Sequence, residues 1–169
     1  MWLTQPSLIS ITSLPITTNA LPQGVDQESS LGQVFYGTAG TAGVAAQSSY
    51  VQLFNPVGST VIVYVDKMWG IEGAAVFVNI QQTASDLGGA AGTITPGVSG
   101  GAAGQATIKV GTSAAISNAP MWSQQMVVGA LGLQFLFRNP YRLNAGKGVL
   151  MWGSSVNNSL NASIRWREK

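Results

Sequence analysis

Six carboxylates are the side chains of this sequence best suited to acid–base or metal chemistry, and no histidine or cysteine accompanies them. They are Asp26, Glu28, Asp66, Glu72, Asp86 and Glu168. A glycoside hydrolase needs two carboxylates that face each other across a sugar, and spacing in the sequence leaves open whether two of these converge. Because charged residues usually stay exposed, and these lie mostly at predicted turns or strand ends, a solvated surface is the favoured role.

The residues that most enzymes rely on are missing. Without histidine and cysteine, the chain lacks the commonest general base, the commonest metal ligand, thiolate nucleophiles and disulfides. Asp26 and Glu28 lie in VDQES, which lacks the further oxygen ligands of a calcium loop. The glycine-rich stretch 88–104 has no GK[ST] ending and so fails the test for a phosphate-binding loop. We therefore expect no catalytic residue, cofactor, metal or small-molecule substrate, and no enzymatic activity.

Tryptophans offer binding chemistry instead, because an indole ring stacks on sugars and fills protein interfaces. Trp69, Trp122 and Trp152 lie near predicted turns, where they would line a sugar site, line a subunit interface or close the ends of the fold. Trp166 lies on the apolar side of an alternating segment, which favours the core.

The composition favours a subunit that assembles. Only 8% of the 169 residues are charged, against about 25% in average soluble domains, and an uncharged polar surface suits burial against other subunits. Basic residues cluster only in the terminal Arg165, Arg167 and Lys169, so we expect no nucleic-acid partner. The longest nearly apolar run, 126–137, is shorter than the roughly 20 residues of a membrane helix. The start, MWLTQPSLIS, has no positive region typical of a signal peptide. We expect neither a membrane partner nor secretion.

The elements that would position these side chains are strands. The segments AAVFVNIQ, QATIKV and SLNASIRWRE alternate apolar and polar residues with a period of two, and no comparable helical period appears. The fold class predicted is all-β, an antiparallel β-sandwich or jelly roll with at least seven strands after residue 49.

Individual strands and turns follow from the same pattern. SYVQLFNPVGSTVIVYVDKMWG predicts two neighbouring strands joined by the turn NPVGS, with 61–65 covered on both faces. Further strands are expected at 126–138, with a bulge or bend at Gly129 and Gly132, and at 148–153. A turn is expected around Pro140 and Gly146, and 84–104 is expected to be an exposed loop.

Residues 1–49 are predicted to be an extended N-terminal arm, and residues 50–169 the sandwich. The arm contains three prolines up to residue 22 and short apolar pairs between them. Such a segment either adds a strand to the sheet edge of a neighbouring subunit or is a floppy terminus. The candidate partner-binding residues are Trp2, Leu3, Leu8, Ile9, Ile11, Leu14, Ile16, Trp69 and Trp122.

Three segments carry a family resemblance. LFNPVGS, LNAGKGVLMW and the final WRE resemble segments of small jelly-roll virion proteins of tailed bacteriophages, and the likeness covers roughly the last two thirds of the chain. The resemblance implies a capsid decoration or cement protein that bridges major capsid subunits as a homo-oligomer, with a trimer favoured. It also implies synthesis in the host cytoplasm and a final place in the virion, on the head surface. The alternative is a carbohydrate-binding or receptor-binding module of a phage fibre, tail or collar component.

Overall fold

The computed structural model describes residues 33–73, 76–116, 121–127 and 132–169, with the side chains of all of these except 76 and 121–127. The described residues contain eleven strands and no helix. The strands are β1 (Gln33–Thr41), β2 (Ser48–Asn55), β3 (Val63–Glu72), β4 (Val76–Thr83), β5 (Ala90–Ala91), β6 (Thr93–Pro96), β7 (Thr107–Ser113), β8 (Met121–Val127), β9 (Leu133–Leu143), β10 (Lys147–Val156) and β11 (Leu160–Glu168).

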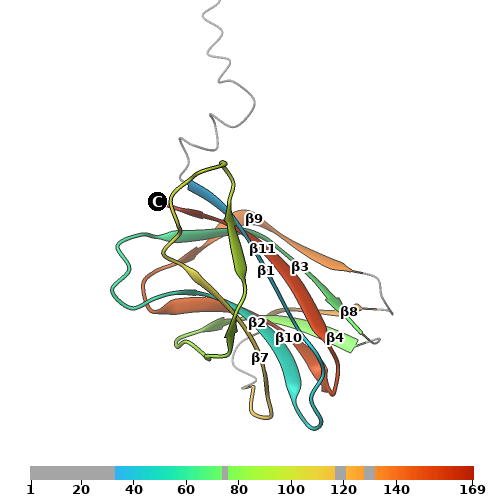
Figure 1. The fold of residues 1–169 in the computed structure, drawn as a ribbon. Coiled ribbons are helices and arrows are strands. Elements are labelled where there is room, and N and C mark those ends of the chain that lie inside the picture. Colours follow the sequence, from blue (N-terminus) through green and yellow to red (C-terminus); the bar gives the residue numbers. More distant parts are fainter. Residues whose placement is uncertain (1–32, 74–75, 117–120, 128–131) are drawn as a thin grey trace, which may run out of the picture.

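The strands form two packed antiparallel sheets (Figure 1). The five-stranded sheet has the order β6-β1-β11-β3-β9, and the six-stranded sheet has the order β5-β7-β2-β10-β4-β8. The predicted all-β antiparallel sandwich is therefore confirmed.

The pairing of the strands is nested along the chain. When the short inserted β5 and β6 and the adjoining β7 are set aside, β1 pairs with β11, β2 with β10, β3 with β9 and β4 with β8. Every connection among these eight strands crosses from one sheet to the other, except the one between β4 and β8. The first and last described strands, β1 and β11, are therefore neighbours in the five-stranded sheet.

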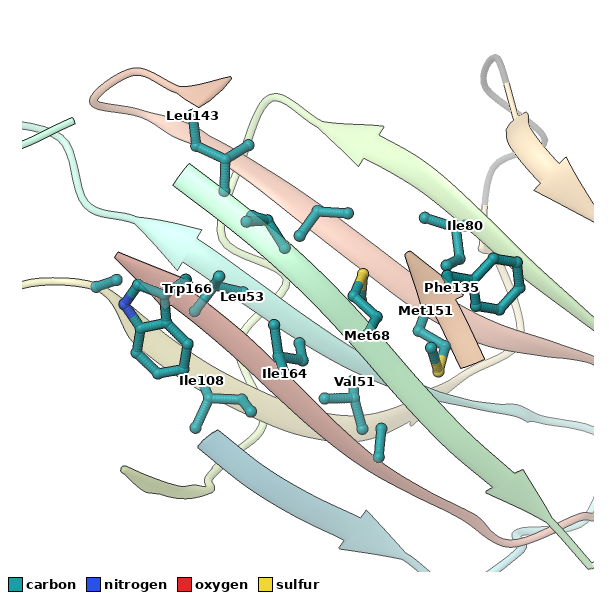
Figure 2. Packing of buried hydrophobic residues seen from close by; sticks show 14 of the residues in the cluster. Val51, Leu53, Met68, Ile80, Ile108, Phe135, Leu143, Met151, Ile164 and Trp166 are labelled. Carbon is teal, nitrogen blue, oxygen red and sulfur yellow. The ribbon is translucent and has the colours of Figure 1, made fainter. Parts of the chain in front are cut away.

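The inner faces of the two sheets enclose one apolar core (Figure 2). Val51 and Leu53 of β2 face Ile164 and Trp166 of β11, and all four are essentially inaccessible to solvent. Trp166 stacks on Phe35 with ring centroids 5.6 Å apart. The predicted core position of Trp166 is confirmed, because its strand alternates between core and solvent without interruption.

The sandwich begins before the predicted boundary at residue 50. β1 lies inside the five-stranded sheet, between β6 and β11, and its Phe35 is fully buried. Residues 33–49, which the sequence pattern placed in the arm, therefore belong to the sandwich. The sequence of β1 does not show the apolar alternation of a strand, because small residues occupy inward positions. At Gly37, for example, a Cβ would lie 2.8 Å from a ring carbon of Trp166.

Several other local predictions need correction. β2 and β3 are not sheet neighbours, because the turn between them carries the chain from one sheet to the other. The strand covered on both faces is β2, all of whose residues are buried, whereas β3 alternates. The predicted strand 126–138 overlaps two strands, β8 and β9, and Pro140 lies within β9. The predicted loop 84–104 contains the short strands β5 and β6.

Two of the segments that carry the family resemblance contact each other through Asn55. The buried Asn55 side chain donates from Nδ2 to the carbonyls of Val61 (3.0 Å) and Leu143 (3.1 Å). The backbone carbonyl of Asn55 accepts from the Gly146 amide at 2.8 Å. Gly58 and Gly146 both have positive φ, 86° and 75°, which favours glycine in these tight turns. Asn55 therefore fixes the two turns at one end of the sandwich.

Candidate functional site

Trp69 is the predicted partner-binding residue whose side chain the structure describes. Trp2, Leu3, Leu8, Ile9, Ile11, Leu14 and Ile16 lie outside the described residues, and Trp122 lies in β8, where only the backbone is described. Trp69 is half-buried in β3 of the five-stranded sheet, whereas β8 belongs to the six-stranded sheet. The two tryptophans therefore do not share a sheet.

The third candidate tryptophan, Trp152, is largely buried. Its side chain is 7% exposed, and its Nε1 donates to the Gln81 Oε1 at 3.1 Å. It packs with Tyr50 and Leu150 on the outer side of the six-stranded sheet. As it stands, Trp152 does not offer an open stacking platform.

The outer surface of the five-stranded sheet around Trp69 gathers aromatic and basic side chains, and we name it the Trp69 face. Its members come from four adjacent strands: Tyr36 and Thr38 of β1, Ser163, Arg165 and Arg167 of β11, Tyr64, Asp66, Lys67 and Trp69 of β3, and Gln134, Leu136 and Arg142 of β9. On β1 and β11 these residues alternate with the core residues, so they point away from the core. On β3 a register shift places the consecutive Asp66 and Lys67 on this same outer side.

Strand register arranges these side chains in rows across the sheet. One row runs Tyr36, Arg165, Lys67 and Leu136, and the next runs Thr38, Ser163, Trp69 and Gln134. Directly opposite residues on neighbouring strands lie close enough for their side chains to interact. Tyr36 and Leu136, at the two ends of the first row, are 45% and 70% exposed. The first row is therefore an apolar–basic stripe open to a partner.

The charge of the Trp69 face is strongly unbalanced. It carries four basic residues, Lys67, Arg142, Arg165 and Arg167, and one acidic residue, Asp66. Asp66 accepts from Nε and Nη2 of Arg167, with the closest N–O distance 2.7 Å. The guanidinium of Arg165 lies 5.9 Å from the centroid of the Tyr36 ring, a cation–π contact.

This face corrects a prediction made from the sequence. The basic residues of the C-terminal strand are joined by others from distant parts of the sequence. Register places Lys67 opposite Arg165, and Arg142 in the same row as Arg167 with Tyr64 between them. The expectation that the protein has no nucleic-acid partner rested on the lack of such a patch, so it loses that support.

Two hollows flank the Trp69 side chain. A hollow of about 530 Å³ is lined by Tyr36, Lys67, Trp69, Gln134 and Arg165, among others. A second, of about 470 Å³, lies toward β5 and β6 and shares Thr38, Trp69 and Ser163 with the first. Gly132 permits this placement, because a Cβ there would lie 2.6 Å from the Nε1 of Trp69. Gly132 was predicted to mark a bulge or bend within a strand, but it lies just before β9, and its contact is with the indole ring of Trp69.

The four described carboxylates do not form a catalytic pair. Asp66 is paired with Arg167 on the outer side of the sheet. Glu168 is buried and accepts from the Trp166 indole at 3.0 Å and from the amides of Gln105 and Ala106. Glu72 is fully buried at the opposite end of β11, since it pairs with Leu160. Asp86 accepts from the nearby Gly88 amide in an exposed loop.

Metal-ligand clusters and membrane-spanning helices are also absent from the described part of the chain. A scan against protein-family models and searches of curated proteins and solved structures returned no significant match. The resemblance to phage virion proteins remains a prediction from the sequence.

Proposed function

We propose that this protein is a non-enzymatic structural component of a phage virion, a decoration or cement protein that binds the assembled capsid. The observation that carries this proposal is the Trp69 face, a broad open sheet surface with exposed Tyr36 and Leu136 set among basic side chains. Exposed apolar groups within a polar rim are typical of protein interaction sites.

The strand order supports the same proposal. Eight strands with nested antiparallel pairing across two sheets support a jelly-roll topology, an architecture found in viral capsid proteins and in lectins. Because one fold serves several functions, the choice between these classes depends on the surface that the fold presents.

The occupant of the Trp69 face is an acidic surface of the major capsid protein. Its four basic side chains outnumber its one acidic side chain, which is already paired, so an acidic partner is electrostatically complementary. A second copy of the same face is disfavoured because like charges would meet. Subunit contacts in a homotrimer, if this state forms, would therefore use other surfaces.

Such a protein stabilises a shell by mass action. A partner that binds only the assembled lattice shifts the equilibrium toward the assembled state. Because the contact is charged, we expect binding to weaken as the salt concentration rises.

Co-sedimentation with purified shells that lack the protein tests the proposal. The wild-type protein is expected to sediment with the shells, and the double variant Lys67→Glu, Arg142→Glu is expected to stay in the supernatant. The control Lys109→Glu, Lys147→Glu changes the net charge equally but acts on the six-stranded sheet. This control should sediment like the wild type.

Three other outcomes would count against the proposal. A wild-type protein that does not sediment with the shells would overturn the proposed function. Equal loss of binding in both double variants would show that net charge, and not this face, controls binding. Binding to single-stranded DNA that is lost only in the Lys67, Arg142 variant would identify nucleic acid as the occupant.

A further inference from the structure

The outer side of the six-stranded sheet contains a pocket that the proposed capsid contact does not use. It has a volume of about 310 Å³, at the lower end of the range of about 300–1,000 Å³ found for small-molecule sites. Its floor comes from three adjacent strands: Tyr50 of β2, Leu150 of β10 and Gln81 of β4. Ile116 packs against the same cluster from one wall.

The opposite wall is held in place by partly buried hydrogen bonds. Gln52 Nε2 donates to the Ser85 carbonyl at 2.8 Å, and Gln52 Oε1 accepts from the Leu87 amide at 2.9 Å. The Tyr50 hydroxyl lies 3.3 Å from the carbonyls of Leu87 and Gly88. These hydrogen bonds hold residues 85–88, which follow β4, against the outer side of the sheet. A cavity with such fixed walls loses little entropy when a ligand enters.

The chemistry of the pocket is neutral, polar and partly apolar. Its described lining residues carry no formal charge: Tyr50, Gln81, Gln82, Thr83, Ala84, Ser85, Leu87, Thr112, Ser113, Ala115, Ile116 and Leu150. Amide side chains both donate and accept, and so do hydroxyls. Thr83 Oγ1, for example, accepts from Gln52 Nε2 at 2.6 Å and keeps its own proton to donate.

We infer that this pocket binds a neutral sugar residue. A sugar ring presents hydroxyls, which both donate and accept, together with C–H faces, which pack on the accessible lining residues Leu87 and Ile116. A charged ligand would find no opposite charge among the described lining residues to offset its desolvation. The site differs from the tryptophan platforms expected from the sequence, and it does not depend on the capsid function.

Trp152 provides a built-in reporter for this site. Its Nε1 donates to Gln81 Oε1 at 3.1 Å, and Gln81 lines the pocket. A sugar hydroxyl that contacts Gln81 would change the polarity around the indole, so bound sugar should alter tryptophan emission even though Trp152 does not touch the ligand.

Isothermal titration calorimetry with glucose, galactose, mannose, N-acetylglucosamine and lactose tests the inference, with tryptophan fluorescence recorded in parallel. We expect saturable binding of at least one of these neutral sugars. Ala115→Trp fills the pocket from an exposed position in its lining and should abolish binding. Ala114→Trp, at the exposed neighbouring residue outside the lining, should leave binding unchanged. Trp152→Phe should remove the fluorescence change while the calorimetric signal persists.

Two results would overturn the inference. One is the absence of saturable binding to every sugar in the panel by a wild-type protein whose folding has been verified by circular dichroism. The other is binding that survives in Ala115→Trp as well as in Ala114→Trp, which would place the sugar elsewhere. Tighter binding of glucuronic acid than of glucose would contradict the neutral character assigned to the ligand.

Discussion

Glu72 is a buried carboxyl group at the end of β3. It is fully inaccessible to solvent, and neither of its oxygens has a hydrogen-bond partner in the described structure. It packs against Gly153 so closely that no Cβ would fit there. Burial disfavours the ionised form and raises the pKa of Glu72 from 4.5 to about 7.

The raised pKa predicts that stability falls as pH rises. Between pH 4.5 and 7 the folded protein keeps a proton on Glu72 that the unfolded chain has released. The Glu72 contribution is therefore complete below about pH 4.5 and lost near pH 7, a change of about 3 kcal/mol. Glu72→Gln, which stays neutral, should lose this dependence and be more stable than the wild type at pH 8.

Urea unfolding at pH 5 and pH 8 measures the effect. The control Asp86→Asn removes an exposed carboxylate and should retain the wild-type change in unfolding free energy between the two values of pH. An equal pH dependence in the wild type and in Glu72→Gln would contradict the assignment.

The sequence could not reveal that Glu72 is buried, because β3 contains a bulge. Register shifts between Val65 and Lys67, so the inward positions change from Val63 and Val65 to Met68 and Glu72. An uninterrupted alternation would have turned Trp69 toward the core. A bulge adds one residue to a strand, and VYVDKMWGIE contains no glycine or proline near the shift to mark it. The burial of β11 alternates without a break from Leu160 to Glu168, because the extra residue at its register shift with β3 lies in β3. The core position of Trp166 could therefore be predicted.

At the scale of elements, Asn55 joins the turn after β2 to the turn before β10. Replacing it with alanine would leave the carbonyls of Val61 and Leu143 without their buried donor. We expect Asn55→Ala to lower the free energy of unfolding by about 2 kcal/mol, since unsatisfied buried polar groups cost about 1–3 kcal/mol each.

Chemical denaturation of Asn55→Ala beside Val57→Ala checks this expectation. Val57 lies in the same turn but is 85% exposed, so its truncation should change the unfolding free energy by less than about 0.5 kcal/mol. Similar unfolding free energies of the two variants would show that the side-chain amide of Asn55 does not hold the two turns together.

Strands with one buried face were predictable, because burial of one face produces alternating apolar and polar residues. The prediction failed for strands whose two faces are equally buried or lack large apolar residues. β2 is covered on both sides, by the core and by residues 84–88, so Gln52 is as buried as Leu53. In β1, the inward positions after Phe35 are occupied by the small residues Gly37 and Ala39, and the strand is recognisable only from its pairing with β11. Long-range pairing of this kind leaves no local signature in the sequence.

At the scale of the whole molecule, the two outer sheet surfaces differ. The six-stranded sheet is partly covered by the chain's own loop, which leaves a small neutral pocket. The outer side of the five-stranded sheet is open, and its Trp69 face carries four of the eight Lys and Arg residues; a fifth, Arg138, also lies in β9. Composition predicted a subunit with little charge but could not predict that half of its positive charge lies on one face, because that depends on which strands become neighbours.

The arm hypothesis makes a prediction for the whole chain. The described sandwich begins at Gln33, so deleting residues 1–20 leaves residues 21–32 ahead of β1. We expect the truncated protein to keep the wild-type urea midpoint, because none of the described core residues is removed. We also expect it to lose incorporation into shells, because the candidate residues Trp2 to Ile16 would add a strand to a neighbouring sheet edge.

Comparing this deletion with Lys67→Glu, Arg142→Glu separates two contacts. Each change alone is expected to prevent co-sedimentation with the shells. At higher protein concentration, where weak binding can still be measured, the two losses of binding free energy should add if the arm and the Trp69 face bind independently. Undiminished incorporation of the deletion would remove the arm from the mechanism and leave the Trp69 face as the sole anchor. A lowered urea midpoint would instead mean that residues 1–20 stabilise the sandwich, and the arm would then be part of the folded domain.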